Sequence, residues 1–200
     1  MSLDQSGRED EATPRQRLLE AAAALFAGKG YSGTSVREIV TAAGVTKPVL
    51  YYYFENKEGI FRAILEFAEE KQREILAHVA QARGGFFDRL ILLYEEFSEG
   101  ISEHQNEFKM LYSLFLGPPQ GAPEYDLEVY LNRLKEIIQT LYREGVEAGQ
   151  VIETDPDIVA LLFFSLFSLF VRDDSQYGPV YDKEMPLKVI RLAFRGLQKS

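Results

Sequence analysis

Three consecutive tyrosines, preceded by a lysine and a proline, form the most distinctive stretch of this sequence. The run reads Lys47-Pro48-Val49-Leu50-Tyr51-Tyr52-Tyr53-Phe54. Three adjacent side chains on a helix spread around its axis, so these tyrosines cannot all be buried. An exposed tyrosine offers a flat ring and a hydroxyl group for sugar or phosphate, and Lys47 offers a cation near the helix start. The alternative is that the tyrosines are large core residues of a small helix.

Two short helices joined by a glycine turn would position these side chains. Ser35 and Glu38 have the S-x-x-E spacing of a capping box, which predicts that the first helix starts at Ser35. Gly44 can take the left-handed conformation that ends a helix, and Thr46 can cap the next one. Pro48 then falls in the first turn, where a proline loses no intrahelical hydrogen bond. This arrangement lays a second helix into the DNA major groove.

An ordered series of short runs covers about the first third of the chain. The runs are Leu18-Leu19-Glu20-Ala21-Ala22-Ala23-Ala24-Leu25-Phe26, Gly30-Tyr31, Thr34-Ser35-Val36-Arg37-Glu38-Ile39, Ala43-Gly44-Val45, Leu50-Tyr51-Tyr52-Tyr53-Phe54 and Asn56-Lys57-Glu58. In this order and spacing they resemble the DNA-binding domain of TetR-type transcriptional regulators. The resemblance implies an all-helical homodimer whose N-terminal three-helix domain binds an operator. Its C-terminal domain would bind a small molecule and dimerise.

We expect DNA contacts from the helix-turn-helix and from the ends of its neighbouring helices. Thr13, Pro14 and Gln16 predict a capping box with a proline at the first helical position, so Arg15 lies near the start of the first helix. Lys47 is suited to the acceptors of guanine, and Lys57 begins a helix capped by Asn56, where free amides could meet a phosphate. The expected contact residues are Arg15, Thr34, Ser35, Thr46, Lys47, Pro48, Val49, Tyr51, Tyr52, Tyr53 and Lys57.

Composition and charge fit a DNA-binding protein with an acidic remainder. The 200 residues are 46% hydrophobic and include no cysteine, so a sizeable core is expected without disulfides or thiolate metal sites. Residues 12–62 carry a net charge of +3 and residues 63–200 a net charge of −9. An acidic remainder would discourage nucleic acid from binding the wrong face, although an asymmetry of this size can also arise by chance. With no signal peptide, we expect a cytoplasmic protein.

Helical periodicity continues to the C-terminus and predicts an all-α fold of about nine helices. We expect a disordered tail over residues 1–11, a helix-turn-helix domain over residues 12–72 (its helix-turn-helix at 35–54), and an effector-binding and dimerisation domain over residues 73–200. Later helices are expected at residues 57–82, 86–103, 105–116, 125–148, 158–171 and 185–197. Residues 158–171 are apolar on every side, so a partner subunit is expected to cover part of this helix. The expected dimer contacts are Phe164, Phe167, Leu169, Phe170, Ile190 and Phe194.

Aromatic residues are frequent in the C-terminal part and either line an apolar ligand pocket or simply fill the core. The resemblance favours a pocket lined by Tyr94, Phe97, Phe108, Tyr112, Phe115, Tyr130, Tyr142 and Phe163. Catalysis finds no support, because no nucleophile, phosphate-binding or dinucleotide motif is present. His104 beside Glu103 and Glu107 is read as a solvated helix end and not as a metal site. We therefore expect no catalytic residue, no metal, no cofactor and no membrane partner.

The sequence thus predicts a ligand-responsive transcriptional regulator that binds double-stranded DNA. We expect a repressor that binds a palindromic operator as a homodimer and is released by a largely apolar small molecule. A transcriptional activator or co-regulator of the same fold remains an alternative. So does an all-helical small-molecule-binding protein or enzyme in which the DNA-binding domain is a relic.

Overall fold

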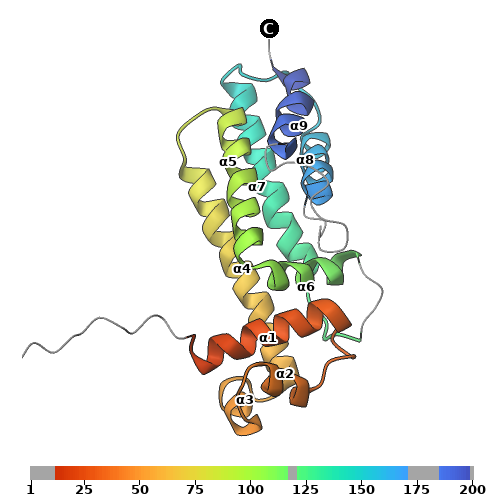
Figure 1. Ribbon diagram of the computed structural model, residues 1–200. Coiled ribbons are helices and arrows are strands. Elements are labelled where there is room, and N and C mark those ends of the chain that lie inside the picture. The colour runs from red at the N-terminus through yellow and green to blue at the C-terminus, as the bar shows by residue number, and fades with distance from the viewer. Residues whose placement is uncertain (1–11, 117–120, 171–184, 199–200) are drawn as a thin grey trace, which may run out of the picture. The chain divides into compact units, whose positions relative to one another are not determined.

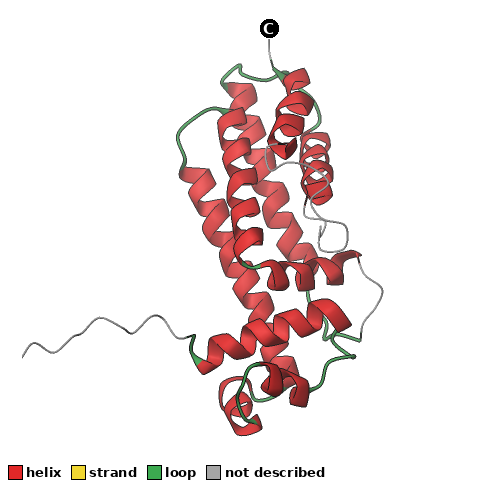
Figure 2. Ribbon diagram, in the orientation of Figure 1, coloured by secondary structure: helices red, strands yellow, loops and turns green. Residues whose placement is uncertain are grey.

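A computed structural model of the protein describes residues 12–116, 121–170 and 185–198 (Figure 1). The predicted tail over residues 1–11 lies outside the described residues. Within these ranges the chain forms α-helices, one 3-10 helix and no strand, apart from an isolated bridge between Val151 and Gln198 (Figure 2). The helices are α1 (Pro14–Lys29), α2 (Val36–Ala42), α3 (Lys47–Phe54), α4 (Lys57–Gln81), α5 (Phe86–Glu103), α6 (Gln105–Leu116), α7 (Leu127–Glu147), α8 (Pro156–Phe170), α9 (Met185–Phe194) and η2 (Arg195–Leu197). The predicted all-α class is confirmed.

The chain divides into two compact units that share α4. The first unit contains the described residues up to Ala68 together with the described part of Asn106–Pro123, and so includes α6. The second contains Glu69–Gln105 and the described residues from Glu124 onward. From the sequence we predicted a domain boundary after residue 72, with all later residues in one domain. This boundary stays a prediction.

In the first unit, α1, α2 and α3 pack into one small cluster around the start of α4 (Figure 1). The core takes residues from each helix: Leu18, Ala22, Ala23, Phe26, Ile39, Val40, Leu50, Phe54, Ile60 and Phe61 are all buried. The rings of Phe26 and Tyr31 both contact the ring of Phe61 edge-on, with centroids 5.5 and 5.0 Å apart. Burial of these apolar faces holds three short helices that would be marginal in isolation.

Both predicted capping boxes form. Thr13 Oγ1 accepts a hydrogen bond from the Gln16 amide at 3.2 Å, and Gln16 Oε1 accepts one from the Thr13 amide at 2.8 Å. Ser35 Oγ accepts from the Glu38 amide at 3.3 Å, while Glu38 Oε2 accepts from the Ser35 amide at 2.9 Å. Each pair satisfies two amides that the first helical turn leaves without partners.

The second unit is a bundle of α5, α7, α8, α9 and the C-terminal part of α4. Its buried cluster includes Ile75, Val79, Phe86, Leu90, Leu93, Leu134, Ile138, Leu141, Val159, Phe163, Ile190 and Phe194. Asp126 accepts from the Val129 amide at 3.2 Å, so α7 begins at Leu127 and not at the predicted residue 125. None of the helices in the described ranges combines the length and apolar character that crossing a bilayer requires.

Candidate DNA-binding site and the second unit

The turn between α2 and α3 has the predicted glycine conformation. Gly44 takes φ 63°, in the left-handed region, and the amide of Val45 donates to Val40 O at 3.0 Å. Thr46 occupies the N-cap position of α3, but its hydroxyl makes no capping hydrogen bond. The predicted capping role of Thr46 is therefore wrong, and its exposed side chain is not engaged by the helix end.

Helix α3 presents two different faces. Leu50 and Phe54 are buried against the other helices of the unit. Tyr51, Tyr52 and Tyr53 are 48%, 82% and 39% exposed, so none of the three is a buried core residue. The rings of Tyr52 and Tyr53 lie edge-on with centroids 5.0 Å apart.

The start of α3 continues this exposed surface. Lys47 and Pro48 are exposed in the first turn, and Val49 is half-buried. Arg15 on α1 is exposed as well, and its guanidinium lies 5.4 Å from the centroid of the Phe54 ring. The first unit therefore exposes a lysine, an arginine and three tyrosines on and next to α3, while the opposite face of α3 is buried in the core.

Two predicted contact residues just before α2, Thr34 and Ser35, form hydrogen bonds within the chain. The Thr34 side chain is buried, and its hydroxyl lies 2.9 Å from Gly30 O and 3.2 Å from Leu25 O. Thr34 thus has no exposed side chain to offer DNA, and we leave it out of the interface. Ser35 is exposed, but its hydroxyl caps α2 and donates to Glu38 Oε2 at 2.8 Å.

The cap of α2 is electrostatically reinforced. A hydrogen bond from Lys29 and hydrogen bonds from the Ser35 amide and hydroxyl lower the pKa of Glu38 to about 2. Glu38 therefore keeps its charge well below its ordinary titration range. Because the carboxylate lies in the first turn of α2, its negative charge also favours the partial positive charge of that helix end.

Lys57 is held by the loop that precedes α2. Its Nζ donates to Tyr31 O at 2.9 Å and to Thr34 O at 3.0 Å, and it lies 4.0 Å from the centroid of the Tyr31 ring. The sequence assigned Lys57 to a DNA phosphate, whereas the structure shows its ammonium group engaged with two carbonyls. The predicted cap of this helix is confirmed, since Asn56 Oδ1 accepts from the Gly59 amide at 2.8 Å.

Replacing Lys57 with methionine is expected to lower the free energy of unfolding by about 1–3 kcal/mol, because two carbonyls lose a charged donor. The slope of operator affinity against salt concentration should stay unchanged, whereas loss of a phosphate contact would reduce it by about 1. Thermal unfolding and binding titrations at several salt concentrations measure both quantities. The control is Lys71→Met on the same helix, which removes only an exposed ion pair with Glu74.

Arg17 on α1 has a structural role that the sequence alone did not indicate. Its Nε donates to Ala43 O at 3.2 Å and its Nη1 to Ala12 O at 3.4 Å. The side chain thereby connects α1 to the end of α2, just before the turn that leads into α3. No local pattern signals this contact, because Ala43 is distant from Arg17 in sequence.

In the second unit, three residues of the predicted pocket form part of a packed aromatic cluster. The rings of Tyr94, Phe97 and Phe163 each contact Phe167, with centroids 6.2, 5.5 and 6.0 Å apart. Phe167 was predicted to contact a second subunit, but its ring packs against the core of its own chain. Phe108 and Tyr112 lie on α6 in the first unit, and the side chain of Phe115 lies outside the described residues.

The hydroxyl of Tyr142, a residue predicted to line the pocket, has a structural role. Its hydroxyl lies 2.9 Å from Ile152 O and 3.1 Å from Thr154 O, and it accepts a hydrogen bond from the Thr154 amide. These bonds hold the segment between α7 and α8 against the bundle. The hydroxyl is therefore already engaged within the chain.

The predicted dimer residues are also revised. Ile190 and Phe194 are each only 1% exposed, because α9 turns them into the core of its own unit, and Phe164 is partly buried against the same core. The side chains of Leu169 and Phe170 lie outside the described residues. Among the described side chains of α8 and α9, the exposed large apolar ones are Ile158, Leu161 and Leu192, at 59%, 66% and 69% exposure.

Comparison with known proteins identifies the family of this chain. Residues 18–64 match the family model described as bacterial regulatory proteins of the tetR family. The chain is 30% identical over 153 residues to the HTH-type transcriptional repressor KstR2 of Rhodococcus jostii, covering 73% of this chain and 68% of that protein. The chain belongs to the TetR family of transcriptional regulators, whose members bind DNA through a helix-turn-helix.

Solved structures share the fold over nearly the whole chain. The TetR family transcriptional regulator PfmR from Thermus thermophilus superposes with a TM-score of 0.73 at 27% identity, covering 92% of this chain and 100% of that one. AibR in complex with isovaleryl coenzyme A and operator DNA superposes with a TM-score of 0.70 at 19% identity, covering 90% and 97% of the two chains.

Proposed function

We propose that this regulator is a repressor that binds a palindromic operator as a homodimer and is released by a largely apolar small molecule. The observation that carries the proposal is the exposure of Lys47, Tyr51 and Tyr52 on α3, whose opposite face is fixed by buried Leu50 and Phe54. A rigid short helix with an exposed cation and phenols at its outer face suits the major groove.

We propose that some of these residues contact base edges and others the sugar-phosphate backbone. Lys47 and Pro48, with Thr46 and half-buried Val49, are at the helix start that reaches base edges. Tyr51, Tyr52, Tyr53 and Arg15 contact the sugar-phosphate backbone, where they fix register without reading sequence. Ser35 is exposed and contributes at the capped start of α2.

Dimerisation is proposed to use the exposed stripe of α8 together with α9. Ile158, Leu161 and Ser165 share one face of α8, because they are spaced three and four residues apart. Exposed Leu192 on α9 adds to this apolar surface, and α8 and α9 pack against each other. A two-fold dimer buries the same patch on both subunits and would set two recognition helices about 34–36 Å apart, or a multiple of that.

The effector is proposed to bind within the second unit and to favour the state that does not fit the operator. AibR, which has the same fold, has been observed with isovaleryl coenzyme A and operator DNA together. Helix α4 is continuous from Lys57 to Gln81 and so belongs to both units. A tenfold loss of operator affinity requires the effector to prefer the released state by about 1.4 kcal/mol.

Lys47→Ala is expected to cost about 1–3 kcal/mol of operator binding and to relax sequence preference at one position in each half-site, because lysine favours the acceptors of guanine. Specificity profiling with a randomised operator library measures both effects. Lys135→Ala, which removes the same charge from the second unit, serves as the control. Identical profiles for wild type and Lys47→Ala would make Lys47 a backbone contact.

The direct test is binding to the DNA upstream of the protein's own gene, followed by a reporter assay. A repressor lowers reporter expression and an activator raises it, which separates the two regulators of this fold. A ligand carrier with a relic DNA-binding domain would bind this DNA no better than random DNA. That outcome would refute the proposed function.

A further inference from the structure

A glutamine interrupts the apolar face of α4 in the second unit. Gln72 is fully buried, and it lies four residues after buried Ala68 and three before buried Ile75. Its Nε2 donates to the backbone oxygen of Tyr130 on α7 at 2.8 Å. Its Oε1 is buried as well and has no hydrogen-bond partner among the residues that the structure describes. A buried amide oxygen without a donor is unfavourable, so this side chain needs an explanation other than packing.

The orientation of the amide group follows from its one partner. The Tyr130 backbone oxygen can only accept a hydrogen bond, so the nitrogen of Gln72 must face it. Oε1 therefore points away from that carbonyl, and only a donor can satisfy it. Because Tyr130 lies in the interior of α7, its carbonyl has a helical partner and does not depend on Gln72.

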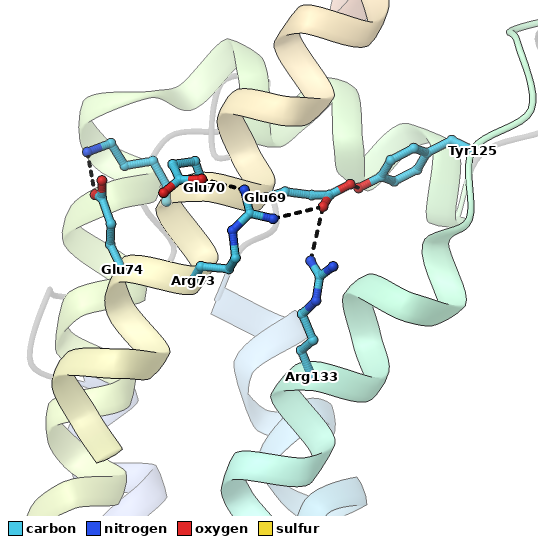
Figure 3. A network of polar contacts seen from close by, with 7 residues as sticks. Glu69, Glu70, Arg73, Glu74, Tyr125 and Arg133 are labelled. Carbon is cyan, nitrogen blue, oxygen red and sulfur yellow. Dashed lines mark hydrogen bonds and ion pairs between the residues drawn. The ribbon is translucent and has the colours of Figure 1, made fainter. Parts of the chain in front are cut away.

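Residues that flank Gln72 on α4 belong to a network of hydrogen bonds and ion pairs with residues of α7 and the segment before it (Figure 3). Glu69, one turn earlier on α4, accepts from the Tyr125 hydroxyl at 2.8 Å, from Arg133 at 3.0 Å and from Arg73 at 3.3 Å. Arg73 is also paired with Glu70. Both arginines are thus already ion-paired with carboxylates of the chain. Within this network, no arginine is left unpaired to bind a ligand carboxylate.

The two tyrosines of this region are held in their neutral form. Burial and the hydrogen bond to Glu69 raise the pKa of Tyr125, and burial and the charge of Glu69 raise the pKa of Tyr130. An anionic ligand group next to Gln72 would likewise lose solvation on burial, and the two arginines of this network already pair with Glu69. A neutral donor needs no cation and loses less solvation on burial.

We propose that Gln72 Oε1 accepts a hydrogen bond from the effector, and that the effector is an apolar molecule carrying a neutral O–H or N–H donor, such as an alcohol or a primary amide. The inference rests on the proposed function, because it places the effector in the second unit. The inference excludes two kinds of effector: molecules that place a carboxylate next to Gln72 Oε1, and molecules whose polar group there can only accept hydrogen bonds. A site built to pair with a donor discriminates strongly against analogues that lack it.

The test uses four probes that share a linear ten-carbon chain and differ only in its polar end group: decan-1-ol, decanamide, methyl decanoate and sodium decanoate. Calorimetric titration gives their dissociation constants for wild type, for Gln72→Met and for the control Gln81→Met, which changes an exposed glutamine on the same helix. The alcohol and the amide should bind wild type at least about tenfold more tightly than the ester and the carboxylate. Gln72→Met should remove this preference, and Gln81→Met should keep it.

Stability without ligand provides a second readout that a purely structural glutamine would not give. Methionine has a similar volume and no polar atom, so Gln72→Met should unfold at the same or a higher temperature than wild type while losing its preference for donors. A lower melting temperature would show that the buried amide group stabilises the chain without any ligand, as a purely structural glutamine would, and would overturn the inference. Equal binding of all four probes, or binding of none, would also overturn it.

Operator binding in the same samples separates this inference from the proposed function. If wild type binds its upstream DNA but the probes show no donor preference, only the role of Gln72 is refuted. If wild type does not bind that DNA specifically, the proposed function itself is refuted.

Discussion

Replacing Gly59 with alanine is expected to abolish high-affinity operator binding and to lower the free energy of unfolding by about 2–4 kcal/mol. Gly59 lies in the first turn of α4, and a Cβ atom added there would lie 1.9 Å from Phe54 O, the last carbonyl of α3. Since that neighbour is backbone, it cannot rotate away as a side chain would. Either the turn between α3 and α4 opens or the start of α4 unwinds.

Either change would move the recognition helix relative to the rest of the first unit. Glu55, within this turn, already has φ 59°, which is strained for a residue with a side chain, so the turn has little freedom to adjust. Thermal unfolding and fluorescence anisotropy with operator DNA measure the two effects. The matched control is Gly28→Ala on α1, where a Cβ would meet nothing within 4 Å. Gly28→Ala should be neutral or slightly stabilising, because alanine is the better helix former. Normal operator affinity in Gly59→Ala would contradict the described turn.

Leu161→Glu is expected to convert the protein to monomers and to weaken operator binding by about 100-fold or more. Leu161 is 66% exposed at the centre of the proposed dimer face of α8, where a second subunit would bury the new carboxylate next to its symmetry mate. A monomer binds each half-site separately and loses the effective concentration that linkage of two sites provides.

Analytical ultracentrifugation at micromolar concentration and operator titration measure these outcomes. Val129→Glu is the matched control, because Val129 is an exposed apolar residue on α7, outside the proposed interface, at 44% exposure. It should leave the dimer and operator affinity intact. A Leu161→Glu variant that remains dimeric would place the interface elsewhere, and a monomeric wild type would remove the expectation of a palindromic operator.

The features that the sequence predicted correctly depend on residues close together in the chain. Capping boxes at Thr13 and Ser35, the left-handed Gly44 and the Asn56 cap each involve partners three or four residues apart. Helix periods are local in the same way, which is why most helix bounds agree to within a few residues. Geometry alone predicted that the three tyrosines of α3 cannot all be buried, since adjacent helical side chains cannot share one face, and all three are exposed.

The errors concern contacts between residues that are distant in the chain. Lys57 donates to carbonyls 26 and 23 residues away, and nothing near it indicates this. The apolar face of α9 showed that Ile190 and Phe194 must be covered, but not whether a subunit or its own core covers them. Gln72 was not singled out from the sequence, because its unpaired oxygen emerges only from the packing of α4 against α7.

The central claim is that a dimer of this chain recognises a specific DNA site through α3. The most direct measurement is the ratio of affinities for the protein's own upstream DNA and for random DNA at the same salt concentration, with the number of subunits bound determined in the same titration. We predict a ratio of about 10³ or more, two subunits for each palindromic site, and a marked loss of the ratio in Lys47→Ala. A ratio near one, or an undiminished ratio in a variant lacking both Lys47 and Tyr52 side chains, would contradict the account.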